Sequence, residues 1–387
     1  MYYYKLGNIP HKRHTQFRKA DGSLHHEEVM GVHGFSGIQS ILYHLHPPTQ
    51  IRNMEVLCKV EMHYEETGPL RHRHFLAAQT REGGDLIDNR APMLGNHDVV
   101  LYTARPDRAM NYYYKHGQGD DVIFIHEGTG VLESQFGDLR YRAGDYLVIP
   151  AGVIWRFVPD ENVPQRALYV ESFGHITPPK RYLNNYGQFL EHSPYCERDI
   201  RPPDRLITHD ETGEFYLHVK SRGQITRYQY DHHPLDVVGW DGHLFPFAFN
   251  IEDFEPITGR VHQPPPVHQT FDGPGFVLCS FVPRLFDYHP QSIPAPYNHS
   301  NVDSDEVLYY VEGSFMSRKG IERASITVHP NGIPHGPHPG TYEGSIGKTK
   351  TEELAVMVDT FRPLQVTREA VQMEDPKYPT SWLPENH

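Results

Sequence analysis

Short alternating or apolar runs recur between turn residues along the chain from about residue 36 onward. Their lengths and their content of β-branched and aromatic residues are typical of β-strands. The clearest of these runs cover residues 38–48, 55–64, 98–106, 121–130 and 145–152. The chain also contains 32 glycines and 33 prolines, which are the main turn formers. The pattern therefore predicts many short strands joined by tight turns.

Residues 130–150 predict a hairpin that turns at "FGDL", followed by a second turn at "AGD". Residues 176–235 are rich in proline, asparagine, tyrosine and arginine, and they predict a connecting excursion before strands resume at 224–230. No stretch sustains a long 3.6-residue apolar period, and only residues 366–373 predict a short helix near the C-terminus. The predicted fold class is all-β, with short helices at the periphery.

The chain carries an internal repeat that is weak in identity but clear in layout. Residues 114–130 and 141–157 form the first copy, and residues 297–315 and 324–338 form the second, about 180 positions later. Each copy has a histidine, an acidic residue before an apolar strand, a glycine after it, and a second strand leading into Pro-x-Gly. Two fused copies of one β-sandwich unit explain this layout. The predicted division is an N-terminal unit with its connecting excursion at 1–235 and a C-terminal unit at 236–387.

Charge and composition narrow the possible partners. The formal net charge of −13 argues against nucleic acid or an anionic membrane as the main partner. No apolar run is long enough for a transmembrane helix, and the N-terminus lacks the apolar core of a signal peptide. The three cysteines are far apart and odd in number, which fits reduced thiols. These features predict a cytoplasmic protein.

Histidines are unusually frequent, at 28 against 36 lysines and arginines, which points to metal or proton chemistry. Most of them, including those of "RHRH" at 71–74, have no spacing that demands a ligand role. The stretch "HPNGIPHGPHPG" at 329–340 is different, because its prolines and glycines exclude a helix while crowding three histidines onto one stiff turn.

The second repeat resembles the two motifs of the cupin family. The first motif matches His299, Asn301, Glu306 and Gly313, and the second, Pro-x-Gly-x-x-His, matches residues 330–335. The resemblance implies a double-stranded β-helix, or jelly roll, in two copies. It also implies a metal held by His299, Glu306 and His335. The usual second histidine of the first motif is Asn301 in this chain.

Two imidazoles and one carboxylate with open positions opposite them form the facial triad of non-haem iron(II) enzymes. A structural zinc site would instead be closed by four protein ligands. The rigid Pro-Gly turn would aim His335 at the point fixed by His299 and Glu306.

The first repeat keeps only part of this pattern. It contains His116, Gln118 and Asp121, but its second motif ends in Trp155, which cannot ligate a metal. The N-terminal unit is therefore expected to have kept the sandwich and lost the site.

Within the cupins, the chain resembles homogentisate 1,2-dioxygenase most closely. The matching stretches lie at 236–242, 245–262, 297–306 and 328–337, and the match is thinner at 22–37 and 359–372. The resemblance implies Fe(II) as cofactor, His262 as the active-site base, and substrate contacts from His329 and His335. It also implies a small aromatic dihydroxy acid and O₂ as substrates, ring opening to maleylacetoacetate, and a homo-oligomer built from trimers.

Several alternatives stay open at the level of the sequence. His268 competes with His262 for the role of base, and Phe315 stands where the family has a substrate-contacting tyrosine. Tyr309, Tyr310 and Arg318 could hold a substrate carboxylate, although alternating tyrosines in a strand are more often core residues. A gentisate- or hydroquinone-cleaving enzyme and a non-catalytic double cupin are the other function hypotheses. A zinc or manganese isomerase is disfavoured, because such cupins commonly keep the histidine that Asn301 replaces.

Overall fold

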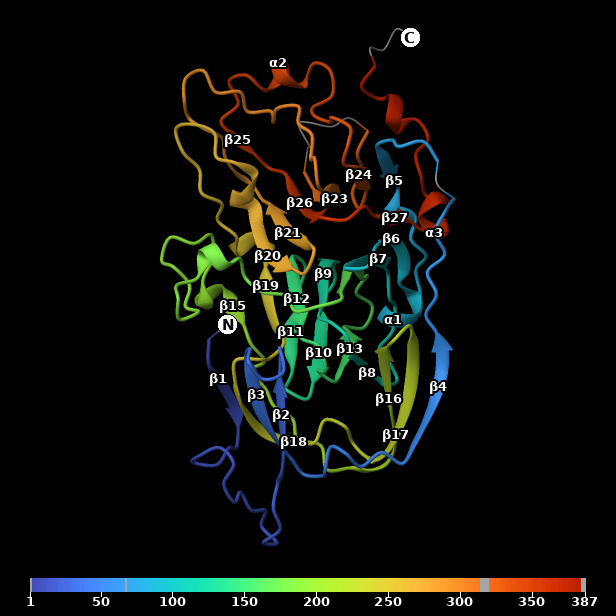
Figure 1. Cartoon of the computed structure of the whole chain (residues 1–387), viewed down its shortest axis with the longest axis vertical. Coiled ribbons are helices and arrows are strands. Elements are labelled where there is room, and N and C mark those ends of the chain that lie inside the picture. Colours follow the sequence, from blue (N-terminus) through green and yellow to red (C-terminus); the bar gives the residue numbers. More distant parts are fainter. Residues whose placement is uncertain (1, 67, 314–319, 384–387) are drawn as a thin grey trace.

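The computed structural model describes residues 2–66, 68–313 and 320–383, and most of the strands predicted from the sequence are present in it (Figure 1). The runs at 98–106, 121–130 and 145–152 form β7 (Val99–Ala104), β9 (Asp121–Glu127) and β12 (Asp145–Ile149). The predicted hairpin is formed by β10 (Gly130–Ser134) and β11 (Leu139–Tyr141), which pair in antiparallel fashion.

Two large sheets hold most of the N-terminal half. In order of hydrogen-bonded neighbours, the eight-stranded sheet contains β15 (Ile200–Arg201), β19 (Phe247–Asn250), β12, β9, β14 (Arg166–Ser172), β7, β6 (Ala91–Gly95) and β27 (Gln365–Val366). The seven-stranded sheet contains β11, β10, β13 (Trp155–Pro159), β8 (Tyr113–His116), β16 (Thr212–Ser221), β17 (Gln224–His232) and β4 (Asn53–Lys59). A four-stranded sheet contains β1 (Tyr4–Gly7), β18 (Val237–Gly242), β3 (Gln39–His44) and β2 (His26–Gly31).

A six-stranded sheet forms the centre of the C-terminal half. Its order is β20 (Gln269–Gly273), β21 (Phe276–Phe281), β26 (Leu354–Thr360), β23 (Asp305–Glu312), β24 (Ile326–His329) and β5 (Arg73–Phe75). A small ladder beside it joins β22 (Arg284–Leu285) to β25 (Lys350–Thr351).

The sheet orders show the internal repeat directly. The order β12-β9-β14-β7-β6 in the N-terminal half matches β24-β23-β26-β21-β20 in the C-terminal half, and all these pairs are antiparallel. The first strand of each series also has an equivalent outer neighbour, β19 beside β12 and β5 beside β24.

Each of these outer strands comes from one half of the chain and pairs in the sheet of the other half. β19 comes from beyond residue 235 but pairs in the N-terminal sheet, and β5 comes from the N-terminal half but pairs in the C-terminal sheet. Figure 1 shows the blue β5 among the orange and red strands. The domain division at residues 235 and 236 stays a prediction, since strands from both sides of it share sheets.

The core is continuous across the two repeats. β7, β9 and β14 are buried along nearly their whole length, which explains their apolar runs on both faces. One hydrophobic cluster of the described residues joins them to β23 and β26. The C-terminal half therefore packs directly on the larger sheets.

The helices are short and peripheral, as predicted. They are α1 (Leu86–Asn89), α2 (Thr341–Ser345) and α3 (Arg368–Val371), with 3-10 turns η1 (Ala77–Gln79), η2 (Lys180–Tyr182), η3 (Glu197–Asp199), η4 (Ile251–Asp253), η5 (Pro265–His268) and η6 (Tyr378–Thr380). The predicted helix at 366–373 contains α3, whose first turn is capped by Thr367. Among the described residues, no helix has the length and apolar character needed to cross a bilayer.

The excursion at 176–235 departs from expectation in one respect. It contains the ten-residue strand β16, which pairs in parallel with β8 and antiparallel with β17. Most of its side chains are half-buried or exposed, so its sequence lacks the buried apolar run that marked the other strands.

Candidate metal centre

Three side chains predicted as metal ligands converge in the C-terminal half. One ligand atom each of His299, Glu306 and His335 lies within 4.8 Å of the other two. His299 Nε2 is 3.5 Å from Glu306 Oε2, and His335 Nε2 is 3.2 Å from Glu306 Oε1. Across residues 2–66, 68–313 and 320–383, no second cluster of three metal-ligating side chains is this tight.

Backbone pairing sets the relative positions of these ligands. The amide N–H of His299 donates to the carbonyl of His335 at 2.8 Å, and the reverse bond is 2.9 Å long. The two imidazole ring centres lie 4.1 Å apart. Glu306 is the second residue of β23 and stands across from His329 on β24. The pairing of β23 with β24 thus positions Glu306, and the β-bridge between His299 and His335 positions the two imidazoles, so the site is preorganised.

The turn that carries His335 depends on two glycines. Gly332 has a φ of +88°, a left-handed conformation that a side chain would strain. Gly336 packs so closely that an added Cβ would lie 1.9 Å from Asn298 Oδ1. The carboxylate of Asp305 fastens the same turn by accepting from the amide of Asn331 at 2.9 Å. The predicted role of the Pro-Gly turn as a rigid support agrees with these contacts.

The tautomer of His299 follows from its neighbour. Its Nδ1 lies 3.1 Å from the carbonyl oxygen of Tyr297, which can only accept a hydrogen bond. A neutral His299 therefore carries its proton on Nδ1, and the lone pair of Nε2 points toward Glu306 and His335. A backbone carbonyl commonly orients a metal-ligating histidine in this way.

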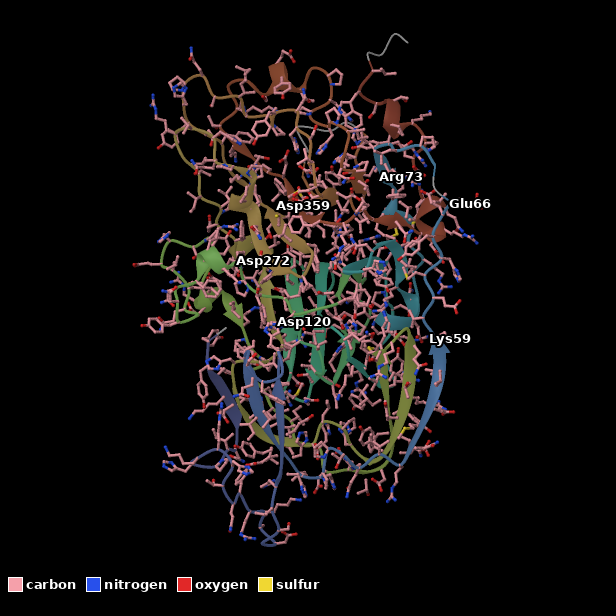
Figure 2. All side chains as sticks on the ribbon, in the orientation of Figure 1. Lys59, Glu66, Arg73, Asp120, Asp272 and Asp359 are labelled. Carbon is pink, nitrogen blue, oxygen red and sulfur yellow. The ribbon has the colours of Figure 1, made fainter. Side chains whose placement is uncertain are left out.

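The charge of Glu306 is stabilised by histidines. Burial by itself would raise the pKa of its carboxyl, but the neighbouring imidazoles of His299, His329 and His335 hold that pKa well below the ordinary value. Asp359 of β26 stands opposite Glu306 of β23. Burial, and to a smaller extent the negative charge of Glu306, raises the pKa of Asp359 to about 8. Asp359 lies among the C-terminal strands in Figure 2. Glu306 is thus the anionic member of the cluster, while Asp359 keeps its proton at neutral pH.

The donor set fits iron(II). Two imidazoles and one carboxylate are the facial set that this metal takes in non-haem enzymes. His335 is 3% exposed, and within the described part of the chain neither of its ring nitrogens has a hydrogen-bond partner, although Nε2 lies 3.2 Å from Glu306 Oε1. Burying such nitrogens costs free energy unless they bind something else, so His335 is suited to coordinate a metal.

His329 and His338 of the histidine-rich turn are both buried. His329 Nδ1 is 2.8 Å from Glu306 Oε1, and its Nε2 is 3.0 Å from the hydroxyl of Tyr378. Its ring stacks on that of His335 at 4.4 Å. His338 Nε2 is 3.1 Å from the hydroxyl of Ser381. One histidine of the turn thus joins the ligand cluster, and two contact the C-terminal segment.

The two candidate bases occupy different environments. The side chain of His262 is 55% exposed; its Nε2 lies 3.2 Å from the Tyr297 hydroxyl and its Nδ1 lies 3.4 Å from Asp287 Oδ2. His268 is buried and stacked on Phe281, and burial lowers its pKa to about 3. His262 approaches the cluster through Tyr297, whose ring lies 6.0 Å from that of His299.

The remaining candidates fall in the core or outside the described residues. Tyr309 and Tyr310 are buried, with their hydroxyls 2.6 Å from His126 Nδ1 and 3.0 Å from Thr327 Oγ1, as expected for core tyrosines. Phe315 and Arg318 lie outside the described residues.

The first repeat places a lysine beside its surviving motif residues. His116 Nδ1 lies 3.1 Å from Asp121 Oδ1, and its Nε2 lies 3.9 Å from the buried carboxylate of Glu171. The ammonium of Lys220 forms an ion pair with the same carboxylate, and charged neighbours lower the pKa of Glu171 to about 2 despite its burial. Trp155 is fully buried, with its ring 5.2 Å from that of Tyr114. The loss of the metal from this half stays a prediction.

Sequence reasoning missed the remote residues around the cluster. His72, from the dismissed "RHRH" stretch, lies 5.9 Å from the His335 ring, and its Nε2 is 3.1 Å from the Pro334 carbonyl. Arg73 of β5 joins the C-terminal strands in Figure 2. Tyr378 is equally remote in sequence. No local spacing signals these contacts, because they join residues 49 to 262 positions apart.

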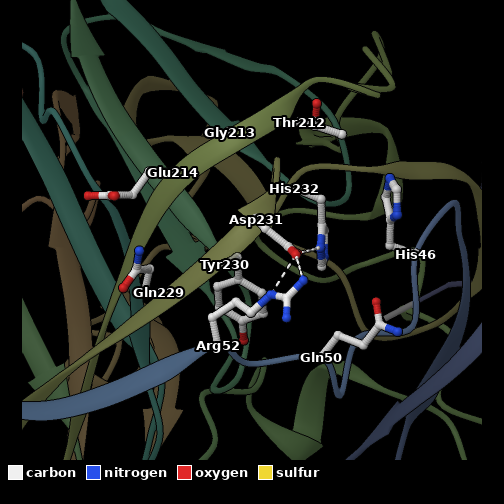
Figure 3. A pocket seen from close by; sticks show the side chains of 10 residues that line it. All are labelled: His46, Gln50, Arg52, Thr212, Gly213, Glu214, Gln229, Tyr230, Asp231 and His232. Atoms are coloured by element: carbon white, nitrogen blue, oxygen red, sulfur yellow. Dashed lines mark hydrogen bonds and ion pairs between the residues drawn. The ribbon is translucent and has the colours of Figure 1, made fainter.

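A separate pocket of about 570 Å³ lies in the N-terminal half (Figure 3). Its lining includes the stacked rings of His46 and His232 and the ion pair of Arg52 with Asp231. It shares no residue with the ligand cluster.

The repeated sheet order and the two-histidine, one-carboxylate cluster define a protein of the double-cupin class. A sequence profile described as "Homogentisate 1,2-dioxygenase N-terminal" matches residues 42–251, more than half of the chain. The chain therefore belongs to the homogentisate 1,2-dioxygenase family, and the predicted family membership and all-β fold class are confirmed.

Curated relatives agree with this assignment. A protein of Saccharolobus solfataricus named "Putative dioxygenase" is 40% identical over 385 residues, covering 99% of both chains. Homogentisate 1,2-dioxygenase of Emericella nidulans is 26% identical, covering 64% of this chain and 56% of the relative. That of Caenorhabditis elegans is 25% identical, covering 89% of this chain and 84% of the relative. The prediction of a dioxygenase-like enzyme is confirmed at this level.

Among solved structures, a cupin 2 conserved barrel domain protein from Leptotrichia buccalis aligns over 79% of this chain and 100% of its own. The identity is 9% and the TM-score is 0.34. At so low a score, the fold assignment rests on the sheet order of the chain itself.

Proposed function

We propose that this chain is an iron(II)-dependent dioxygenase that opens the aromatic ring of homogentisate with O₂ to give maleylacetoacetate. The observation that carries the proposal is the convergence of His299, Glu306 and His335 within 4.8 Å. These residues would hold the iron, which supplies redox chemistry with O₂ and a positive charge that favours a bound phenolate. The names of the relatives from Emericella nidulans and Caenorhabditis elegans support the choice of substrate.

His262 is the base in this proposal. A neutral, solvent-exposed imidazole can accept the proton of the ring hydroxyl ortho to the carboxymethyl arm. Asp287, 3.4 Å from Nδ1, favours a proton on that nitrogen and leaves Nε2, near the Tyr297 hydroxyl, as the acceptor. His268 is less suited, because a pKa of about 3 makes it a weak base and its ring is buried.

His335 would also border the substrate, as would His329 behind it. Both are buried, and the ring of His329 is engaged by Glu306 and Tyr378. A cytoplasmic location and a homo-oligomer built from trimers belong to the same proposal.

The decisive experiment is anaerobic reconstitution with Fe(II), followed by O₂ uptake with homogentisate and gentisate side by side. Rapid uptake with homogentisate and formation of maleylacetoacetate is the expected result. Faster uptake with gentisate would keep the ring-cleaving chemistry and overturn the substrate. No Fe(II)-dependent uptake with either acid would favour a non-catalytic double cupin.

The substitution Glu306→Gln tests the ligand set directly. It keeps the size of the side chain but removes the charge, so Fe(II) affinity should fall by more than about 100-fold, beyond the loss typical of residues that only orient ligands. Glu312→Gln, at the exposed end of the same strand, is the matched control and should bind as the wild type does. Full activity of Glu306→Gln, with circular dichroism showing an intact fold, would remove the carboxylate from the coordination sphere.

A further inference from the structure

The last described segment of the chain, residues 378–382, lies against the turn that carries His335. The indole Nε1 of Trp382 donates to the carbonyl of Gly336 at 2.9 Å. The hydroxyl of Ser381 lies 3.1 Å from Nε2 of the buried His338. These contacts fall one and three residues after His335, so the segment fastens the turn on its C-terminal side.

Tyr378 contacts the N-terminal side of the same turn. It is 2% exposed, and its hydroxyl lies 3.0 Å from Nε2 of His329, which is itself fully buried. The Nδ1 of His329 then lies 2.8 Å from Glu306 Oε1. Tyr378, His329 and Glu306 therefore form a buried hydrogen-bonded chain that ends on a proposed metal ligand.

The direction of each bond in this chain follows from what each group can do. An ionised carboxylate only accepts, so His329 must donate from Nδ1 to Glu306. A neutral imidazole with its proton on Nδ1 has a lone pair on Nε2, so the hydroxyl of Tyr378 must donate to it. Glu306 sets the tautomer of His329, and the hydroxyl of Tyr378 holds the ring in place from its other nitrogen. Loss of that hydroxyl would remove this restraint on the ring and, through it, a restraint on Glu306 Oε1.

We propose that the C-terminal segment is part of the metal centre and that Tyr378 is a positioning residue for Glu306, acting through His329. The proposal rests on the metal site of the proposed function. It adds a requirement that the cupin motifs do not contain, because Tyr378 lies 49 residues beyond His329 in the chain. Partners that orient a ligand typically contribute 10- to 100-fold to metal affinity.

The test measures the affinity of the full-length apoprotein for cobalt(II), followed by its visible absorption spectrum. Tyr378→Phe should weaken cobalt(II) binding by about 10-fold or more and should change the spectrum of the bound ion. The matched control is Tyr113→Phe, since Tyr113 is also a buried tyrosine, with its hydroxyl 2.7 Å from His233 Nε2 in the N-terminal half. It should lower the melting temperature of the apoprotein comparably while leaving cobalt(II) affinity within twofold of the wild type.

Unchanged cobalt(II) affinity and spectrum in a folded Tyr378→Phe variant would overturn the proposal. If that variant does not fold, Trp382→Phe takes its place, because it removes the N–H that reaches Gly336 while keeping an aromatic ring at this position. Weakened binding there supports the role of the segment, and unchanged binding overturns it. If the wild type binds no cobalt(II), the proposed metal site itself is refuted. If the wild type binds the ion but, loaded with Fe(II), oxidises neither homogentisate nor gentisate, only the proposed dioxygenase function is refuted.

Discussion

Gly336 offers a sharp test of how the two histidine ligands are held together. An added Cβ at this position would lie 1.9 Å from Asn298 Oδ1 and 2.8 Å from Asn298 Cα. The amide of Asn298 can rotate away, but its Cα belongs to the backbone. Asn298 directly precedes His299, and Gly336 directly follows His335. A clash between them therefore pushes the two ligands apart.

The size of the effect follows from these distances. Carbon atoms pack comfortably at about 3.5 Å, so Gly336→Ala demands a backbone separation of about 0.7 Å at this bridge. Overpacking of this kind costs about 1–3 kcal/mol in stability. Functional geometry must hold within about 0.5 Å, so metal affinity should fall by about 10- to 100-fold. Cobalt(II) titration and thermal unfolding of the apoprotein measure the two effects separately.

Gly344→Ala is the matched control for this change. Gly344 lies in α2, and an added Cβ there would meet no atom of the described residues within 4 Å. Alanine is favoured over glycine in a helix by up to about 1 kcal/mol, so this variant should melt at the same temperature or higher and bind metal normally. Wild-type affinity in Gly336→Ala would show that the bridge between residues 299 and 335 does not set the ligand geometry.

Two further predictions concern buried charges away from the cluster. Lys220→Met should destabilise the fold by about 3–5 kcal/mol, because it removes a cation that pairs with the fully buried Glu171; a melting temperature equal to that of the wild type would contradict this. Burial would lower the pKa of His44, but hydrogen bonds to Asp236 and Glu28 raise it from 6.5 to about 9. Because the pKa of His44 is raised in the folded state, its contribution to the free energy of unfolding is complete below pH 6.5 and is lost as pH rises through about 9. The free energy of unfolding of the wild type should therefore fall by on the order of 3 kcal/mol relative to that of His44→Gln over this window. Urea unfolding of both proteins at pH 6 and pH 9.5 measures the difference, and a pH-independent gap would refute the role of His44.

The fold was predictable wherever burial left a mark on the sequence. β7, β9 and β12 are buried along nearly all of their length, so each appears as an apolar run bounded by turn residues. β16 escaped prediction because its side chains are only partly buried. Its place in the sheet is fixed by backbone hydrogen bonds to β8 and β17, and such bonds do not require particular amino acids that could be recognised in the sequence.

The ligand cluster was predictable because its spacing is local. His299 and Glu306 belong to one motif and His335 to the next, and the resemblance to cupin motifs named all three before their distances were known. The residues around them could not be found in this way. The contact of His72 with the Pro334 carbonyl spans 262 positions, and that of Arg73 with Glu374 spans 301. A single sequence carries no record of which distant segments meet.

These distant segments explain how an ordinary motif becomes a rigid site. β5, from the N-terminal half, pairs with β24 and so supports the strand that ends at His329. The C-terminal segment then contacts His329, Gly336 and His338 from the other end of the chain. The turn that carries His335 is therefore supported by a strand of the N-terminal half and by the C-terminal segment, although the proposed ligands themselves lie within 37 residues (299–335). The identity of the proposed ligands is thus a local property of the sequence, whereas their geometry also depends on segments that are distant in the chain.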